Sequence, residues 1–200
     1  MTRRLWLVRH GETTGQSRVR YHGRNDVPLA DAGRAQIRAL APLLAGVDFV
    51  RVVHSPMSRA LESAAILADA CDLPRSLFVA EERLREISFG DCEGMTAAEI
   101  EAAFPDFWRR HQAGTAEAFP GGESRRAFAD RVGSVARELM AEDWAGDLLV
   151  VGHRGTVRQF LRTLLAVPDG TGDAFAVELG SLTVLGQEDG YHVELLGAVP

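Results

Sequence analysis

The 200-residue chain contains no lysine, because each of its 22 basic residues is arginine. The absence of lysine excludes the P-loop, whose motif ends in Gly-Lys-Ser/Thr, and the strand lysine of protein kinases. It also excludes lysine as a Schiff-base nucleophile and as the anchor of pyridoxal phosphate. Arginine instead supplies a permanent, planar cation that suits carboxylate and phosphate groups.

Cysteine, long apolar runs and excess positive charge are scarce as well. The cysteines, Cys71 and Cys92, show no C-x-x-C spacing, so we interpret them as free thiols of a reducing compartment. No apolar run approaches the ~20 residues of a membrane span. The apolar run from Leu5 to Val8 is too short for an export signal. Because neither an export signal nor a membrane span is visible, we expect a cytoplasmic protein. The net charge of −6 argues against nucleic acids and anionic membranes as partners.

Short apolar runs alternate with helical patterns along most of the chain. Continuous runs of this kind are typical of strands buried on both faces of a sheet; they lie at 5–8, 50–53, 77–80 and 148–151. Three later runs, 177–179, 182–185 and 192–195, are expected to be closing strands, the last two joined as a hairpin across 187–190. The alternation predicts an α/β fold, a three-layer α/β/α sandwich with a mainly parallel central sheet. The length suits one domain over residues 1–200.

Apolar residues at helical spacing predict the covering helices. Asp31 is expected to cap a helix whose apolar stripe continues to Leu44. Another helix is expected from about Ser58, with Leu61 facing inward. Two later helices carry the stripes Phe128, Val132, Val135, Leu139 and Val157, Phe160, Leu161, Leu164.

Residues 88–122 interrupt the alternation of strands and helices. Within them, Thr96 and Glu99 match a capping box, which predicts the start of a short helix. The remaining sequence contains several proline and glycine residues. We interpret this segment, which we call the lid, as a small helical insertion in the single domain.

Polar and charged side chains follow three of the predicted strands. Arg9 and His10 follow the first strand, His153 follows the strand at 148–151, and Arg59 opens the helix after the strand at 50–53. Because ligands bind outside the carboxyl ends of parallel strands, we expect these four side chains to share one crevice. The helices that follow the strands at 50–53 and 148–151 are expected to direct the free N–H groups of their N-termini into the same crevice. Together these groups predict a pocket for a phosphate dianion.

An imidazole in such a pocket is a competent nucleophile for phosphorus. The flanking arginines are expected to lower the pKa of His10 and keep it neutral, while His153, as an imidazolium, would stabilise charge on the phosphoryl oxygens. Expelling an alkoxide also requires a carboxylic acid, whose carboxylate can then deprotonate water. The residue types alone leave several candidates for the acid: Glu12, Glu62, Glu81, Glu82, Glu86 and Glu93.

The blocks around these residues occur in a recognisable order. The first is Leu7-Val8-Arg9-His10-Gly11-Glu12-Thr13. The others are Gly23-Arg24-Asn25-Asp26-Val27-Pro28-Leu29 followed by Gly33, His54-Ser55-Pro56-Met57-Ser58-Arg59-Ala60, Leu84-Arg85-Glu86-Ile87-Ser88-Phe89-Gly90 with Glu93-Gly94, Gly121-Gly122-Glu123-Ser124, and Val151-Gly152-His153-Arg154-Gly155. Together they resemble the histidine phosphatase, or phosphoglycerate-mutase-like, superfamily over roughly residues 5 to 165.

The resemblance implies a metal-independent phosphatase of small phosphorylated metabolites that forms a phosphohistidine. His10 would be the nucleophile and Glu86 the proton donor. The phosphoryl group and substrate would be held by Arg9, Gln16, Gly23, Arg59, His153 and Arg154. The resemblance implies no metal or other cofactor, and we expect a monomer or homodimer. The other histidines, His22, His54, His111 and His192, are interpreted as structural.

The branch of the family is less sharply indicated. The Tyr21–Asp26 stretch and the Gly-Gly-Glu-Ser motif are most similar to α-ribazole phosphatases. Mutases of the family use a lysine and paired arginines in the lid, and Ala97 stands where that lysine would align. Arg109 and Arg110 resemble the arginine pair, although a solvated helix face explains them more simply. A cofactor-dependent phosphoglycerate mutase is therefore the alternative, followed by a non-catalytic phosphate-binding regulatory module.

Overall fold

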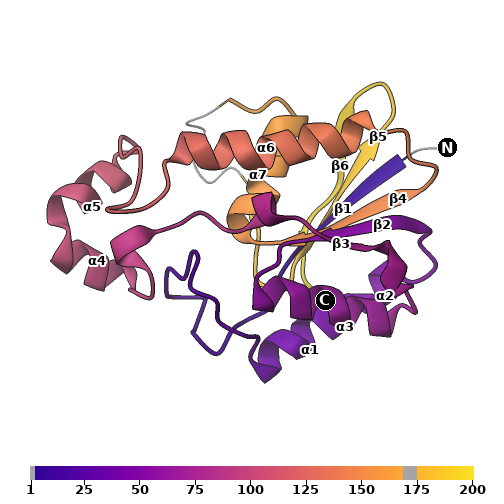
Figure 1. The fold of residues 1–200 in the computed structure, drawn as a ribbon, viewed down its shortest axis with the longest axis horizontal. Coiled ribbons are helices and arrows are strands. Elements are labelled where there is room, and N and C mark those ends of the chain that lie inside the picture. Colours follow the sequence, from indigo (N-terminus) through magenta and orange to yellow (C-terminus); the bar gives the residue numbers. More distant parts are fainter. Residues whose placement is uncertain (1–2, 169–174) are drawn as a thin grey trace.

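The computed structural model describes residues 3–168 and 175–200. Its centre is a six-stranded sheet in the order β3-β2-β4-β1-β5-β6 (Figure 1). The strands are β1 (Arg3–Arg9), β2 (Phe49–His54), β3 (Phe78–Ala80), β4 (Asp147–Gly152), β5 (Leu182–Gln187) and β6 (Tyr191–Ala198). Neighbours from β3 to β1 run parallel, whereas β5 pairs antiparallel with β1 and β6. The predicted mainly parallel sheet and closing hairpin are confirmed.

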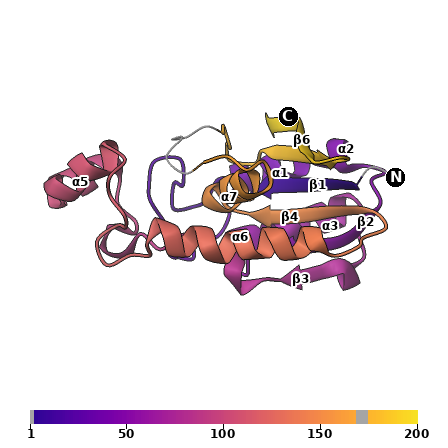
Figure 2. The ribbon, with the colours of Figure 1, turned by 90° about the horizontal axis from the view of Figure 1, so that it is seen from above.

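Helices cover both faces of the sheet and complete the predicted three layers. On one face lie α6 (Arg125–Ala141) and α7 (Arg154–Leu164), and on the other lie α1 (Asp31–Ala39), α2 (Ala41–Leu44) and α3 (Ser58–Ala70). Figure 1 shows the two groups on opposite sides of the strands, and Figure 2 shows α6 running alongside them. Each group packs its apolar stripe on the sheet and excludes water from it.

The central strands contribute apolar side chains to both layers in turn. Leu7 of β1 and Val150 of β4 face α6 and α7, whereas their neighbours Val8 and Val151 face α1 and α3. This double burial explains why these strands are continuous apolar runs in the sequence. It also fixes the register, because a slip of one residue would exchange the two faces.

The lid contains two short helices that pack away from the main core. They are α4 (Ala97–Ala103) and α5 (Pro105–Gln112), and Figure 1 shows them at one end of the molecule. Their own apolar cluster consists of Cys92, Ile100, Phe107, Trp108, Ala116 and Phe119. The predicted capping box is present, since Thr96 and Glu99 each accept a hydrogen bond from the other's backbone N–H. Three short 3₁₀ helices lie between α3 and α4: η1 (Arg75–Leu77) precedes β3, and η2 (Glu82–Leu84) and η3 (Gly90–Cys92) follow it.

The predicted strand at 177–179 is wrong. This segment is irregular, although Val177 and Leu179 are buried. The carbonyl of Val177 accepts a hydrogen bond from the Arg9 side chain, and Gly180 turns the chain with a φ of 65°. These contacts use the backbone groups for a turn next to β1 instead of a ladder.

Three details of the predicted helices on the other face are also wrong. Asp31 is the first helical residue and pairs with Arg34, whereas Ala30 occupies the cap position. The expected continuous stripe is divided at Leu40, where α1 ends and α2 begins with a proline in its first turn. In α3, Leu61 is 48% exposed because the buried stripe runs along Ala60, Ser63, Ala64, Leu67 and Ala68.

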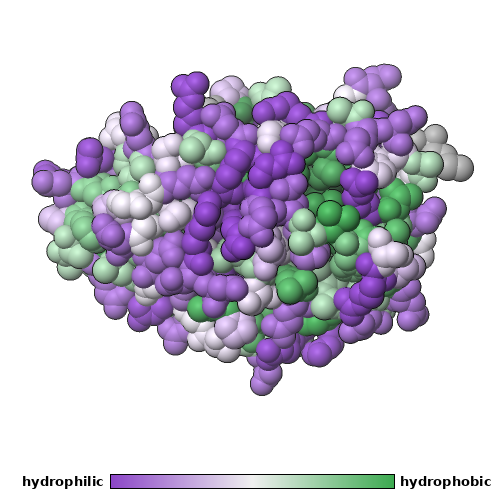
Figure 3. All heavy atoms as spheres, viewed as in Figure 1, coloured by the Kyte–Doolittle hydropathy of each residue, from purple (hydrophilic) through white to green (hydrophobic). Residues whose placement is uncertain are grey.

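The surface seen in Figure 3 is mostly polar. Apolar atoms gather there at the lid end and towards the opposite end of the molecule. Among the helices of residues 3–168 and 175–200, none is long and apolar enough to cross a membrane.

The N-terminus of α3 is capped by a residue from a distant loop. Oδ1 of Asp26 accepts a hydrogen bond from the N–H of Ser58 (2.8 Å), and Oδ2 accepts one from its hydroxyl (2.7 Å). Met57, at the cap position itself, provides no side-chain bond. We predict that Asp26→Ala lowers the free energy of unfolding by about 1 kcal/mol in urea denaturation. Asp130→Ala, which removes an exposed carboxylate of α6, is the control and should cost less than about 0.5 kcal/mol.

Candidate active site

The carboxyl ends of three parallel strands meet at one edge of the sheet. Arg9 pairs with Gly152 in the register of β1 and β4, and the next N–H, that of His10, donates to the Gly152 carbonyl (3.0 Å). After β2, the N–H of Ser55 donates to the carbonyl of Val151 in β4 (3.0 Å). The polar residues that follow these strands are therefore brought together, as the sequence predicted.

His10 is held as a neutral imidazole with one free nitrogen. Its Nδ1 lies 2.7 Å from the carbonyl oxygen of Gly11, which can only accept, so Nδ1 carries the proton and Nε2 keeps its lone pair. Burial lowers the pKa of His10 well below 6.5, and the charges of Arg59 and Arg9 lower it further. The ring is 4% exposed. The geometry therefore leaves Nε2 of His10 with a free lone pair at neutral pH.

Arg9 and Arg59 are buried guanidiniums oriented by backbone carbonyls. Arg9 donates from Nη1 to Val177 (2.7 Å), and Arg59 donates from Nη1 to Asn25 (2.9 Å) and from Nη2 to Gly23 (2.7 Å). Burial lowers the pKa of both groups, that of Arg9 to about 10 with a further contribution from Arg154. Because neutral carbonyls leave the positive charge uncompensated, both side chains remain suited to an anionic ligand.

Gly23 is part of the support for Arg59. Its φ of 49° lies in the left-handed region, and a Cβ there would overlap with Oε1 of Glu93 and the carbonyl of Ile87. A glycine at this position therefore allows the loop to pass close to the segment from Ile87 to Glu93, while the carbonyl of Gly23 orients Arg59. Direct contact between Gly23 and substrate stays a prediction.

His153 is fully buried beside His10, with the ring centroids 5.2 Å apart. Its Nε2 lies 2.8 Å from Oγ of Ser55, and its Nδ1 is buried without a hydrogen-bond partner in the described structure. Burial and the charge of Arg59 lower the pKa of His153 well below 6.5. The expected imidazolium is therefore wrong for this structure, in which His153 is neutral because burial and two guanidiniums oppose a further positive charge.

Glu86 follows η2 in an irregular segment, and its carboxyl group is fixed at both oxygens. Oε1 accepts from the N–H of Ile87 (2.9 Å) and Oε2 from the N–H of Gly155 in α7 (3.1 Å). A Cβ at position 155 would overlap with this carboxyl group, so the glycine permits the approach. The negative charge of Glu86 favours the charged forms of both Arg9 and Arg59, which places it within electrostatic range of the pair.

The other carboxylates considered from sequence have structural partners. Glu62 accepts hydrogen bonds from Arg34 and the Leu29 backbone. The side chains of Glu81 and Glu82 pair with neighbouring arginines of the same segment. The carboxylates of Glu12 and Glu93 accept from backbone N–H groups. Glu86 alone among the six candidates affects the ionisation of both buried arginines.

The N-termini of α3 and α7 are used differently from the prediction. The N–H of Ser58 binds the carboxylate of Asp26, and the N–H of Gly155 binds that of Glu86. These two groups therefore serve protein carboxylates and are not free for a phosphate. The electrostatic support of the pocket comes mainly from Arg9 and Arg59.

The remaining predicted residues lie around the site or away from it. Arg154 is the exposed first residue of α7, and its charge acts on Arg9. Gln16 is exposed in the loop after β1, with a φ of 61°, and its contact with substrate stays a prediction. On α5, Arg109 forms a highly exposed ion pair with Asp106, and Arg110 is exposed as well. This arrangement favours the solvated helix face over a substrate clamp.

Sequence reasoning missed several polar residues of the site. His22, interpreted as structural, is 8% exposed, lowers the pKa of His10, and has a buried Nδ1 without a partner in the described part of the chain. Ser55, which contacts His153, was given no role. Glu123 and Arg131 contact the segment that carries Glu86. The motifs of the sequence include His22, Ser55 and Glu123, but they did not indicate these contacts, and no signal marked Arg131.

Neither cysteine contributes to this site. Cys92 is buried in the lid cluster and Cys71 lies partly buried after α3. Both are free thiols, and burial raises the pKa of each. Across residues 3–168 and 175–200, no group of three or more histidine, cysteine, aspartate or glutamate side chains could hold a metal ion.

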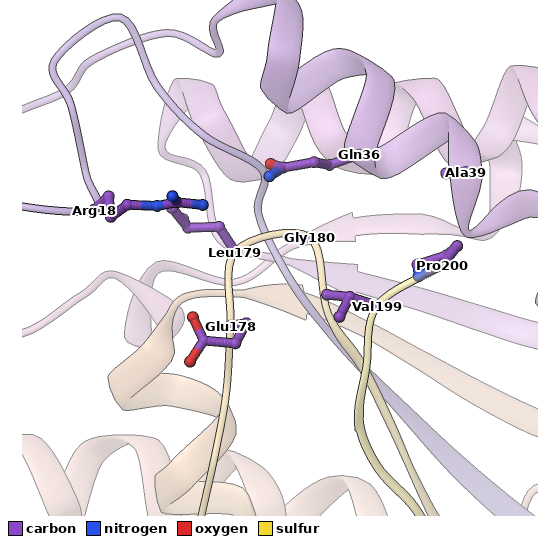
Figure 4. Close-up of a pocket in the computed structure, with 8 residues that line it drawn as sticks. All are labelled: Arg18, Gln36, Ala39, Glu178, Leu179, Gly180, Val199 and Pro200. Carbon is purple, nitrogen blue, oxygen red and sulfur yellow. The ribbon is translucent and has the colours of Figure 1, made fainter.

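A pocket of about 300 Å³ lies next to the edge of the sheet that His10 follows (Figure 4). Its lining consists of Arg18, Gln36, Ala39, Glu178, Leu179, Gly180, Val199 and Pro200. Gly180 links this lining to that edge, since its N–H donates to the carbonyl of His10 (3.0 Å). In Figure 4, Arg18 and Glu178 lie at one end of the pocket, and Val199 and Pro200 lie at the other. It contains none of the four predicted phosphate-binding side chains and is separate from the centre around His10.

Comparison with known proteins decides the family. The sequence pattern of the histidine phosphatase superfamily (branch 1) matches residues 5–197. The chain belongs to this superfamily. A glucosyl-3-phosphoglycerate phosphatase from Mycolicibacterium vanbaalenii is 35% identical over 195 residues, which cover 90% of this chain and 85% of that protein. This histidine phosphatase is thus a phosphoric monoester hydrolase.

Further relatives are named for other activities. The crystal structure of the α-ribazole phosphatase from Shigella flexneri aligns with a TM-score of 0.86 at 26% identity, covering 98% of this chain and 96% of that chain. A 2,3-bisphosphoglycerate-dependent phosphoglycerate mutase 2 from Gloeobacter violaceus is 32% identical over 166 residues, covering 80% of this chain and 74% of the mutase. The predicted similarity to α-ribazole phosphatases is confirmed.

The two buried imidazoles make the stability of the histidine phosphatase depend on pH. Their pKa values lie well below 6.5 in the folded chain, so below pH 6.5 the unfolded chain binds more protons and stability falls. Between pH 7.5 and 5.5 each histidine should lower the free energy of unfolding by on the order of 1 kcal/mol.

Urea denaturation at these two pH values measures this loss. His153→Asn should reduce the wild-type loss by the share of one histidine, whereas the same substitution at the exposed His192 should leave it unchanged. An unchanged loss in His153→Asn would contradict the assignment.

Proposed function

We propose that this histidine phosphatase hydrolyses phosphate monoesters of small metabolites through a phosphohistidine on His10, with Glu86 as the proton donor. The observation that supports it best is a pair of buried donors beside the nucleophile. Nε of Arg9 and Nδ1 of His153 have no hydrogen-bond partner among the described residues. Leaving such groups unpaired costs free energy, so their presence next to His10 indicates an anionic ligand that both can bind.

Binding of the phosphoryl group supplies the first part of the mechanism. Nε of Arg9 donates to one phosphoryl oxygen. The guanidinium of Arg59, in the helix after β2, attracts the dianion from the other side. The contact of Ser55 with Nε2 of His153 suits a ring that carries its proton on Nδ1, so that Nδ1 also donates to the phosphoryl group. These preorganised charges and dipoles stabilise the negative charge of the transition state.

Phosphoryl transfer then proceeds in two steps, first to His10 and then to water. Nε2 of His10 attacks phosphorus and the bond to the ester oxygen breaks, while the carboxylic acid of Glu86 transfers its proton to that oxygen. The Glu86 carboxylate next removes a proton from water, whose oxygen attacks phosphorus and displaces Nε2. Inorganic phosphate leaves, His10 is neutral again, and Glu86 has recovered its proton.

Phosphoglycerate mutase is the second candidate, because a mutase from Gloeobacter violaceus is among the relatives. The exposed ion pair of Arg109 with Asp106 and the absence of lysine weigh against it. A phosphate-release screen that includes glucosyl-3-phosphoglycerate, α-ribazole phosphate and the phosphoglycerates distinguishes the two functions. A phosphatase releases inorganic phosphate without 2,3-bisphosphoglycerate, whereas a mutase interconverts 2- and 3-phosphoglycerate and depends on it.

The nucleophile can be tested by substitution and by trapping. We predict that His10→Ala lowers turnover of p-nitrophenyl phosphate by at least about 10³-fold, because the covalent route is lost. Mass spectrometry of wild-type protein quenched at alkaline pH should show one added phosphoryl group on a peptide containing His10. His192→Ala is the control and should retain full activity. Substantial activity in His10→Ala would refute the covalent mechanism.

The proton donor can be tested through the leaving group. We predict that Glu86→Gln slows hydrolysis of an alkyl phosphate such as glycerol 2-phosphate by about 10²- to 10⁴-fold, because an alkoxide must be protonated as it leaves. Hydrolysis of p-nitrophenyl phosphate should fall much less, since p-nitrophenolate leaves without a proton. Glu82→Gln, next in the sequence to the same segment, should change neither rate. Equal losses on both substrates would point to another acid.

A further inference from the structure

The segment that carries Glu86 has no regular secondary structure of its own. Residues 85–89 lie between η2 and η3, so no helix or sheet ladder fixes their backbone. Hydrogen bonds at both carboxyl oxygens orient the side chain of Glu86, but they act only if its backbone is already in place. Some other group must therefore hold this backbone.

Arg131 of α6 provides these contacts. Its Nη1 donates to the carbonyls of Arg83 (2.6 Å) and Arg85 (2.7 Å), and its Nη2 donates to the carbonyl of Glu86 (3.1 Å). Its guanidinium also lies over the ring of Phe128, 4.8 Å from the centroid. One planar group thus binds three carbonyls of a four-residue stretch that ends at the acid.

Glu123 accepts hydrogen bonds from the remaining N–H groups of this guanidinium. Its Oε1 accepts from Nε of Arg131 (2.7 Å) and its Oε2 accepts from Nη2 (2.8 Å), so all five N–H donors of the arginine are used. Burial opposes ionisation of Glu123, but the hydrogen bonds to Arg131 and the charges of Arg131 and Arg24 together outweigh it and lower the pKa of Glu123. The N–H of Glu123 donates to the carbonyl of Ser88 (3.0 Å), which ties the far end of the same segment.

We propose that Glu123 and Arg131 form a clamp that positions the carboxyl group of Glu86 for proton transfer. The clamp gives the Gly-Gly-Glu-Ser motif a function: its glutamate orients the guanidinium that holds the acid-bearing backbone. The proposal rests on the proposed role of Glu86. Both clamp members are positioning residues, because no contact links either of them directly to His10, Arg9 or Arg59 among the described residues.

The planar fork of arginine is required for this arrangement. A lysine at position 131 would keep the charge but present only a compact ammonium, which cannot bind three carbonyls and both carboxylate oxygens at once. Loss of the clamp should therefore displace the acid while the arginines and His10 keep their places. A displacement of about 1 Å is enough to reduce a reaction rate by about 10²-fold.

The test compares two substrates in clamp variants. We predict that Arg131→Lys and Glu123→Gln lower kcat for glycerol 2-phosphate by about 10- to 100-fold. For p-nitrophenyl phosphate, whose leaving group needs no proton, kcat should fall by less than about threefold, and KM for either substrate should change by less than about twofold. A purely structural defect would lower both rates alike.

Arg83 and Glu138 offer a matched control. They also join η2 to α6, through an ion pair of 2.8 Å, and Arg83 forms a second ion pair of 2.8 Å with Glu81. Both side chains are more exposed than those of the clamp, and neither has a contact with a carbonyl of residues 83–86 in the described structure. Arg83→Lys and Glu138→Gln should leave the ratio of the two rates at the wild-type value. Thermal denaturation of all variants shows whether each one is folded. If Arg131→Lys does not fold, the rates of Glu123→Gln test the clamp.

The double variant Glu86→Gln/Arg131→Lys separates this proposal from the mechanism on which it rests. If the clamp acts through the acid, Arg131→Lys should not change the ratio of the two rates further once Glu86 is replaced. If Glu86→Gln is selective but neither clamp variant is, the clamp is overturned and the acid stands. If Glu86→Gln itself is unselective, the assignment of the acid falls and the clamp falls with it.

Discussion

Burial of two guanidiniums beside two imidazoles is the constraint on which the site of this histidine phosphatase depends. Arg9 and Arg59 are almost inaccessible to solvent, and burial of the two imidazoles together with these charges lowers the pKa of both His10 and His153 well below 6.5. Backbone carbonyls orient these arginines without neutralising them. The pocket is therefore prepared for a dianion before one binds, which is the condition for electrostatic catalysis.

The sheet and its two helical layers make this burial possible. Parallel β1, β2 and β4 end at the same edge, and their apolar runs anchor the polar residues that follow in fixed register. Around that edge, backbone groups outside the sheet bind side chains of the site. The N–H of Gly155 in the first turn of α7 binds Glu86, and the carbonyl of Val177 binds Arg9.

Much of this could be predicted from the sequence. Continuous apolar runs identified the central strands, and the polar residues after them identified His10, Arg9, Arg59 and His153 as neighbours. These inferences worked because strand burial and the direction of parallel strands depend on local patterns. The predicted strand at 177–179 failed because its backbone bonds go to the Arg9 side chain, a partner that lies 168 positions away. Hydrophobicity alone carries no information about such a contact.

The sequence by itself determined the order of elements, the chemistry at the strand ends, and the absence of any lysine-dependent reaction. Only the tertiary structure decided which partners these groups have. It paired Ser55 with His153, and it brought Glu123 and Arg131 to the backbone of the segment that contains Glu86. The physical reason is that a polar group is satisfied by whatever donor or acceptor packing brings near it, and packing joins elements far apart in the chain.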